Sequence, residues 1–425
     1  MALSAAKSEL VAGLFAVAPE DALRRLVGLL STAAVADRSL EPVHAIASAE
    51  ANLRRIVTAV FDPLLALAEG GEAPKRALIR KADLTSAWRR IAAQHDDLAE
   101  RVLALVRTHR PDDEPPLEFD TVCAIAADAC QSEDLARWLR LTPVLRRVEP
   151  RLEAWVRNLS GENVAAVRLA FKDALVIDED AGPAFWEAVF AMLEQPWQVL
   201  RLISAVIDRP SDRYLASSEL SDFGERLLAD IDRRISAVRS FDPMQGEAGG
   251  AAAAAGIAVG VQMIAEFEAW LALAKDGPWG QRIHGLKRSL ALTMEARLRE
   301  VEPAVAAALP TQPVRGTGRS VRPVPKLSAD PTPLHVAKAD ALLTLMDEAR
   351  TSANTGGYAG LRAKTIEALE KRLDQYCEDL LEALRHGAPE EVERARMYLE
   401  IAARFTGMVQ GPQNAQIVRR RAAAA

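Results

Sequence analysis

The sequence contains few aromatic residues and few cysteines. Aromatic side chains make up 5% of the 425 residues, so a hydrophobic core must be built mainly from Leu, Val, Ile and Ala. Because each Ala buries little apolar area, many helices must contribute to the core to stabilise the fold. The three cysteines, Cys123, Cys130 and Cys377, form no C-x-x-C motif, and this sparse, odd count predicts a reducing compartment.

The sequence also lacks the motifs that usually mark catalysis or cofactor binding. It contains no G-x-x-x-x-G-K-[ST], G-x-G-x-x-G, G-x-S-x-G or H-E-x-x-H motif. No two of the six histidines are three or four residues apart, so no helix is expected to present paired imidazoles to a metal. We therefore predict no catalytic residue, cofactor or metal ligand, and an enzyme is the less favoured interpretation.

Strand-like alternation of apolar and polar residues is rare. Apolar residues recur instead at three- and four-residue spacing, which predicts amphipathic helices. The fold class predicted is all-α, with a large multi-helix bundle or irregular helical array. One clear stripe contains Leu220, Phe223, Leu227, Ile231 and Ile235, and another contains Ile366, Leu369, Leu373, Tyr376, Leu380 and Leu384.

The second stripe keeps its spacing for nearly three heptads, which is typical of a bundle seam or a short coiled coil. Two interpretations stay open for it. The C-terminal helices could form a homo-oligomer, or they could pack within one chain.

A proline-rich basic stretch interrupts the helical pattern once. It reads TQPVRGTGRSVRPVPKLSADPTP over 311–333. Composition of this kind is typical of a flexible connector. We predict a large helical body over 1–309, as one domain or two, and a flexible linker over 310–333. A small helical bundle or hairpin module would follow over 334–410, and a disordered basic and Ala-rich tail over 411–425.

The net charge of −6 arises in the predicted body, because the linker is basic. An acidic body disfavours nucleic-acid binding, which needs clustered Lys and Arg. An anionic membrane surface could contact only the linker and the end of the chain. Those basic residues are Arg315, Arg319, Arg322 and Lys326, followed by Arg419, Arg420 and Arg421.

The segment DRPSDR at 208–213 carries four charges and joins two long helical patterns. Its structural interpretation is a capped turn with local ion pairs. Its functional interpretation is a polar contact for a partner protein, because binding residues are often on loops of a rigid scaffold. The candidate contact residues here are Asp208, Arg209, Asp212 and Arg213.

Two apolar runs bear on location. Residues 10–18 are preceded by Glu9, which does not suit a secretory signal and favours an amphipathic helix. Residues 249–265 are short for a bilayer span and dominated by Ala and Gly, which favours a buried helix. We therefore expect a cytoplasmic protein.

The leading hypothesis from these observations is a non-enzymatic scaffold or adaptor that binds other proteins. One alternative is a peripheral membrane protein that uses the basic linker and tail. A second alternative is a helical enzyme, or an accessory domain of an enzyme, whose site has no familiar motif.

Overall fold

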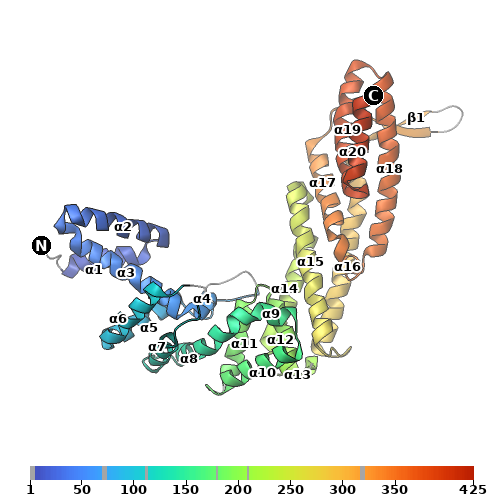
Figure 1. Ribbon diagram of the computed structural model, residues 1–425. Coiled ribbons are helices and arrows are strands. Elements are labelled where there is room, and N and C mark those ends of the chain that lie inside the picture. The colour runs from blue at the N-terminus through green and yellow to red at the C-terminus, as the bar shows by residue number, and fades with distance from the viewer. Residues whose placement is uncertain (1–4, 69–73, 111–112, 179, 208–209, 316–320) are drawn as a thin grey trace. The chain divides into compact units, whose positions relative to one another are not determined.

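The computed structural model describes residues 5–68, 74–110, 113–178, 180–207, 210–315 and 321–425 (Figure 1). Nearly all of the described secondary structure is helical, so the predicted all-α class is confirmed. The chain divides into two compact units, residues 1–208 and 209–425.

The first unit is built from short helices whose ends follow local sequence signals. Proline is disfavoured in the interior of a helix, and the helical patterns around Pro63 and Pro196 are both split. Ser132 and Ser160 accept hydrogen bonds from the first turns of the helices that begin at Glu133 and Gly161, as N-caps do. The helices are α1 (Ala5–Val17), α2 (Glu20–Ala36), α3 (Glu41–Val60), α4 (Asp62–Ala68), α5 (Lys81–Gln94), α6 (Asp96–Thr108), α7 (Leu117–Asp128), α8 (Glu133–Val148), α9 (Leu152–Arg157), α10 (Gly161–Leu175), α11 (Ala181–Met192) and α12 (Val199–Ile207).

Aromatic side chains anchor this first core. The rings of Phe171 and Trp186 stack with their centroids 5.3 Å apart, and Phe185 meets Trp186 edge-on at 5.1 Å. Such pairs add to the burial of the rings themselves. Trp138, Trp155, Trp186 and Trp197 are buried, and Trp270 of the second unit is half-buried.

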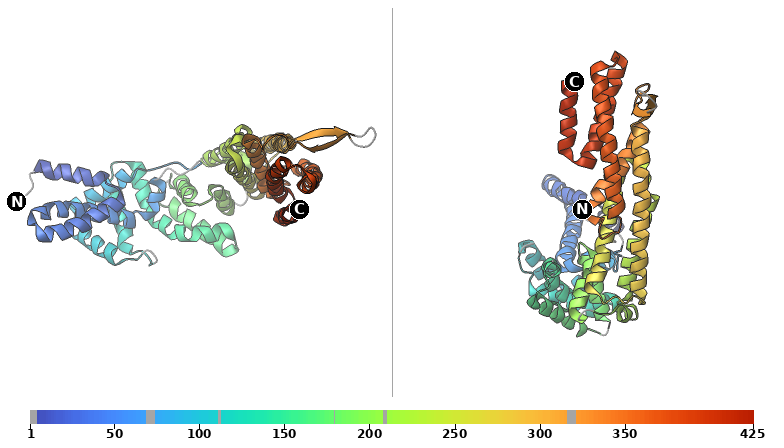
Figure 2. Two further views of the ribbon diagram at one scale, coloured as in Figure 1. Left: turned by 90° about the horizontal axis from the view of Figure 1, so that it is seen from above. Right: turned by 90° about the vertical axis from the view of Figure 1, so that its right-hand side faces the viewer.

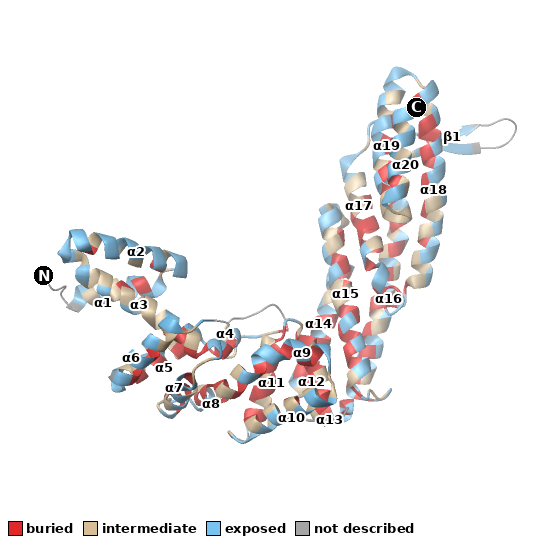
Figure 3. Ribbon diagram, viewed as in Figure 1, coloured by how far each residue is buried: buried red, intermediate tan, exposed pale blue. Residues whose placement is uncertain are grey.

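The second unit contains long helices that run side by side, with their buried faces toward one another (Figures 2 and 3). α17 packs against both α15 and α16, and α19 packs against α18 and α20. The elements are α13 (Asp212–Ala216), α14 (Ser221–Ser240), α15 (Gly246–Trp270), α16 (Pro278–Ala308), β1 (Thr311–Arg315), β2 (Val321–Pro325), α17 (Pro333–Glu348), α18 (Ala359–His386), α19 (Pro389–Gln410) and α20 (Pro412–Ala424).

Small side chains on α15 let α17 approach closely. A Cβ atom added to Gly250 would lie 2.1 Å from the carbonyl oxygen of Ala341, so only glycine fits there. α15 belongs to Pro243–Trp270, a helical segment long and apolar enough to cross a membrane by composition, and half of its most apolar window is buried within the protein. Among the described residues, no other helix reaches that length and hydropathy. The cytoplasmic location stays a prediction.

The division of the chain differs from the one expected from the sequence. Residues 311–315 and 321–325 of the expected linker form an antiparallel hairpin, and α17 returns to the helices that precede it. The expected disordered tail contains α20, which packs on α19 and buries Ala415. The composition of the linker and of the tail suggested flexibility, but strand pairing in the first and helix packing in the second give both a defined structure.

The prolines of the hairpin occupy positions that tolerate them. The backbone N–H of Lys326 donates to the carbonyl oxygen of Pro310 at 3.0 Å, and Pro313 lies opposite Pro323. In an antiparallel ladder, hydrogen-bonded and non-hydrogen-bonded pairs alternate, so the N–H positions of 313, 323 and 325 face outward. Because proline has no N–H, these outer edges offer few donors to another strand.

Candidate functional site

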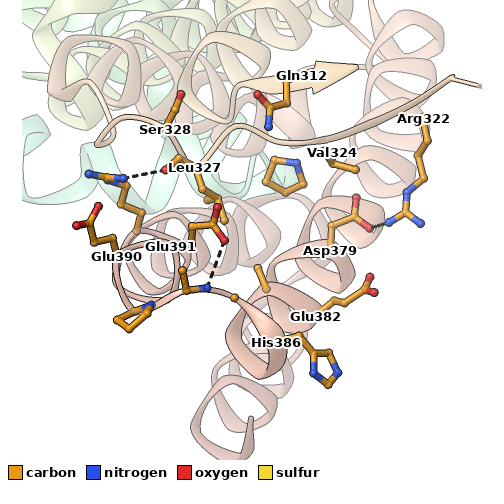
Figure 4. Close-up of a pocket in the computed structure, with 16 residues that line it drawn as sticks. Gln312, Arg322, Val324, Leu327, Ser328, Asp379, Glu382, His386, Glu390 and Glu391 are labelled. Carbon is orange, nitrogen blue, oxygen red and sulfur yellow. Dashed lines mark hydrogen bonds and ion pairs between the residues drawn. The ribbon is translucent and has the colours of Figure 1, made fainter. Parts of the chain in front are cut away.

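A cleft lies beside the hairpin, where α18 ends and α19 begins (Figure 4). Its volume of about 760 Å³ is within the range of ligand-binding cavities in proteins. One wall comes from the hairpin and the segment that follows it. The other comes from the last turn of α18, the Gly387–Ala388 turn and the first turn of α19.

The turn between the two helices follows from its sequence. Gly387 ends α18, and Pro389 begins α19 where its missing N–H costs nothing. The backbone N–H of Ala388 donates to the Glu391 carboxylate at 3.4 Å. Glu390 and Glu391 both lie in the first turn of α19, where the helix dipole favours negative charge.

A buried carboxylate fixes the hairpin wall to α18. The Asp379 side chain is 5% exposed and pairs with the Arg322 guanidinium from β2. The Gln375 side-chain amide donates to the same carboxylate at 2.8 Å. Two partners satisfy a charge that would otherwise be costly to bury. The wall is therefore held in place before any ligand binds.

Three further side chains fix the segment after the hairpin and its base. Arg394 donates to the carbonyl oxygen of Leu327 at 3.1 Å and pairs with Asp330 at 3.2 Å. The Tyr398 hydroxyl donates to the carbonyl oxygen of Ala329 at 3.2 Å. The Tyr376 hydroxyl donates to Pro310 at 3.4 Å, and burial raises the pKa of Tyr376 far above its ordinary value. This phenol therefore stays protonated and keeps its donor.

The cleft is lined by more acidic than basic side chains. Asp379, Glu382, Glu390 and Glu391 face it, against two guanidinium groups and the imidazole of His386. Glu382 and Glu390 form no hydrogen bond or ion pair with other side chains in the part of the chain that the structure describes. Apolar surface lies between these charges. It comes from Val324, Pro325, Leu327, Ala383 and Ala388.

This arrangement of side chains suits the binding of a ligand better than catalysis. Ser328 and His386 line opposite sides of the cleft (Figure 4), so no activated hydroxyl is assembled. Among the described residues, no group of three His, Cys, Asp or Glu side chains could hold a metal ion. What the cleft offers is two unpaired carboxylates beside an apolar surface.

The structure gives Asp212 of the 208–213 segment a structural role. Asp212 has no exposed surface, and its carboxylate accepts from the backbone N–H groups of Gly280 at 3.1 Å and Ala274 at 3.4 Å. Arg213 is exposed and pairs with Asp276. Asp208 and Arg209 lie outside the described residues. A fully buried Asp212 cannot touch a partner, whereas the partner contact stays a prediction for Arg213 and for the two residues outside the described range.

The basic residues of the predicted linker fall in different places. Arg322 lines the cleft and forms an ion pair with Asp379, whereas the exposed Lys326 side chain has no partner among the described residues. Arg319 lies outside the described residues, and so does the side chain of Arg315.

The three arginines at the end of the chain are mostly paired. Arg419 binds Glu400 at 3.0 Å, and Arg421 binds Glu378 at 2.7 Å. Arg420 is exposed and forms no ion pair with a described residue. These pairs tie α20 to α19 and α18.

The acidic residues of the cleft were not among the predicted site residues. The available signal was the Gly387–Ala388–Pro389 turn followed by two glutamates, which is also the ordinary signature of a helix start. The opposite wall comes from residues some 60 positions earlier, and no local pattern links the two. Comparisons of the chain with protein-family models, curated proteins and solved structures found no match.

Proposed function

We propose that the protein is a non-enzymatic helical scaffold or adaptor, and that it holds a segment of a partner protein in the cleft beside the hairpin. One observation supports this above the others. The hairpin wall is fixed by the pair between Arg322 and the buried Asp379, while Glu382 and Glu390 remain unpaired in the cleft. A pre-formed site with unpaired charge loses less entropy on binding than one that must first be ordered.

The partner segment would enter through its side chains and not as an added strand. Strand addition needs free N–H groups along a sheet edge, and Pro313, Pro323 and Pro325 leave few of them on the hairpin. A Lys or Arg side chain complements Glu382 and Glu390, and an apolar neighbour would pack on Val324 and Leu327. Such a segment fits a volume of about 760 Å³.

The two alternatives have less support. Arg419 and Arg421 already pair with Glu400 and Glu378, which leaves less positive charge to attract an anionic membrane. An enzyme would need a reactive constellation, and the polar groups of the cleft lie apart.

Charge reversal tests the proposal. We would replace Glu382 and Glu390 by Lys in one variant, and Glu302 and Glu348 in a control with the same change in net charge. The probes are fluorescein-labelled peptides of alternating Arg and Leu, Glu and Leu, or Ser and Leu. We expect the Arg–Leu peptide to bind the wild type and the control, and the cleft variant to lose roughly tenfold in affinity, about 1.4 kcal/mol. Equal affinity of the cleft variant and the control would refute the proposed site.

A photo-crosslinking amino acid in place of His386 would then identify the partner in cells. It should give an adduct with a second protein that is absent when the same group replaces Glu302. An adduct that survives the double reversal would show that Glu382 and Glu390 do not hold the partner.

A further inference from the structure

A second cavity, of about 640 Å³, lies in the first unit among α2, α3, α4, α5, α6 and α8. Its lining is unexpectedly basic, since the chain as a whole carries a net charge of −6. Five permanently basic side chains and two carboxylates line it, together with His109. The basic residues are Arg24, Arg54, Arg55, Lys81 and Arg146, and the carboxylates are Glu20 and Asp62.

Two of the arginines form a rigid base. Arg54 donates to the carbonyl oxygens of Phe15 and Ala18, each at 2.8 Å, at the C-terminal end of α1. Arg146 donates to the carbonyl oxygen of Val60 at 2.6 Å, at the end of α3. The Arg54 and Arg146 side chains are 17% and 11% exposed. Their guanidinium groups are therefore fixed before a ligand arrives.

The other basic groups are free to turn toward a ligand. Arg55 and Lys81 are exposed and have no hydrogen bond or ion pair to a described side chain. Arg24 reaches Glu20 only at 3.9 Å. The exposed Thr58 hydroxyl adds a neutral donor to the same lining. Guanidinium and ammonium groups around one hollow are the donors that bind phosphate.

Two acidic groups oppose an anion in this cavity: Glu20, which pairs with Arg54 at 3.4 Å, and Asp62. Asp62 lines the cavity near Arg146, and burial raises the pKa of its carboxyl while Arg146 lowers it. At neutral pH its negative charge would repel an anionic ligand. This opposition provides a test in which a single substitution should strengthen binding.

We infer that this cavity binds a small, soluble, phosphate-bearing anion. Arg55 and Lys81 would close on the phosphate, over the base formed by Arg54 and Arg146. The apolar surface of Val106, Ala59 and Pro115 would accept a non-polar part of the ligand. This site lies within residues 1–208 and is independent of the cleft in the second unit.

Calorimetric titration of the full-length protein with inorganic pyrophosphate tests the inference. The double variant Arg55→Gln/Lys81→Gln should bind about tenfold more weakly, because two charge-assisted contacts are lost. Asp62→Asn should bind several-fold more tightly, because a repulsive charge is removed. The control Arg101→Gln/Arg151→Gln removes two exposed charges outside the cavity and should bind as the wild type does.

Three results would overturn the inference. These are no binding of pyrophosphate at millimolar concentration, equal weakening of the cavity variant and the control, or weaker binding by Asp62→Asn. Vesicles of anionic phospholipid form a separate arm, and binding to them without binding of pyrophosphate would also overturn it. Far-UV circular dichroism of each variant ensures that a lost fold is not taken for a lost site.

Discussion

The ion pair between Arg322 and Asp379 leads to an asymmetric prediction. The Asp379 side chain is 5% exposed, whereas the Arg322 side chain is 53% exposed. Arg322→Ala would leave a buried carboxylate with only the Gln375 amide as a partner. Asp379→Ala would leave a guanidinium that can turn into water. We therefore expect the substitution of the more exposed partner to be the more destabilising one.

The magnitude follows from the same exposures. Breaking a fully buried ion pair by removing one partner costs roughly 3–5 kcal/mol. Because Arg322 is half exposed and Gln375 still donates, we expect about 2 kcal/mol for Arg322→Ala and about 1 kcal/mol for Asp379→Ala. The double variant removes the orphaned charge and should cost no more than Asp379→Ala alone, which gives a coupling of about 2 kcal/mol.

Urea unfolding followed by far-UV circular dichroism measures these free energies. The exposed pair of Arg350 and Asp347 is the matched control, and each alanine substitution there should cost less than about 0.5 kcal/mol with little coupling. A larger loss for Asp379→Ala than for Arg322→Ala, or additive losses in the double variant, would show that the pair does not fix the hairpin wall as described.

Three further predictions concern packing, thiol chemistry and the hairpin edge. Gly250→Ala should destabilise the protein by about 2 kcal/mol, because the added Cβ would overlap the Ala341 carbonyl oxygen. A Cβ added to Gly256 would meet no atom within 4 Å, so Gly256→Ala should stabilise the protein by up to about 1 kcal/mol. Thermal unfolding of the two variants distinguishes a loss of stability from a gain. Burial raises the pKa of the Cys123 thiol to about 12 and that of Cys377 to about 11, so both should resist Ellman's reagent at pH 8 while the half-buried Cys130 reacts faster. Equal rates for the three thiols before unfolding would contradict this burial. Pro323→Val restores an outward N–H on β2 and should raise self-association in sedimentation velocity, whereas Val324→Thr should leave it unchanged.

The fold class was predictable because it depends on periodicity. Apolar spacing indicates helices wherever it is sustained, and Pro63 and Pro196 split their patterns for a local steric reason. The hairpin at 311–325 was not predictable in this way. Its prolines resemble those of a linker, and only the alternation between paired strands explains why they are tolerated.

The helix at the end of the chain and the cleft depended on distant partners. Arg419 and Arg421 looked like a free basic tail, yet Glu400 and Glu378 provide their counter-charges from α19 and α18. The cleft joins Arg322 to Asp379, 57 residues apart in the sequence. One sequence read locally cannot reveal which distant side chains will meet, and the cavity of the first unit was missed for the same reason.

The separation of the two walls of the cleft along the chain has a thermodynamic consequence. A ligand that touches both walls can bind only when β2 and α18 are docked, so it must shift the equilibrium toward the folded second unit. At a concentration one hundred times its Kd, such a ligand would add about 2.7 kcal/mol to the stability of that unit. The first unit, which lacks this cleft, would receive none of that gain, so a partner would be recognised by selective protection of residues 210–425 from proteolysis or amide exchange.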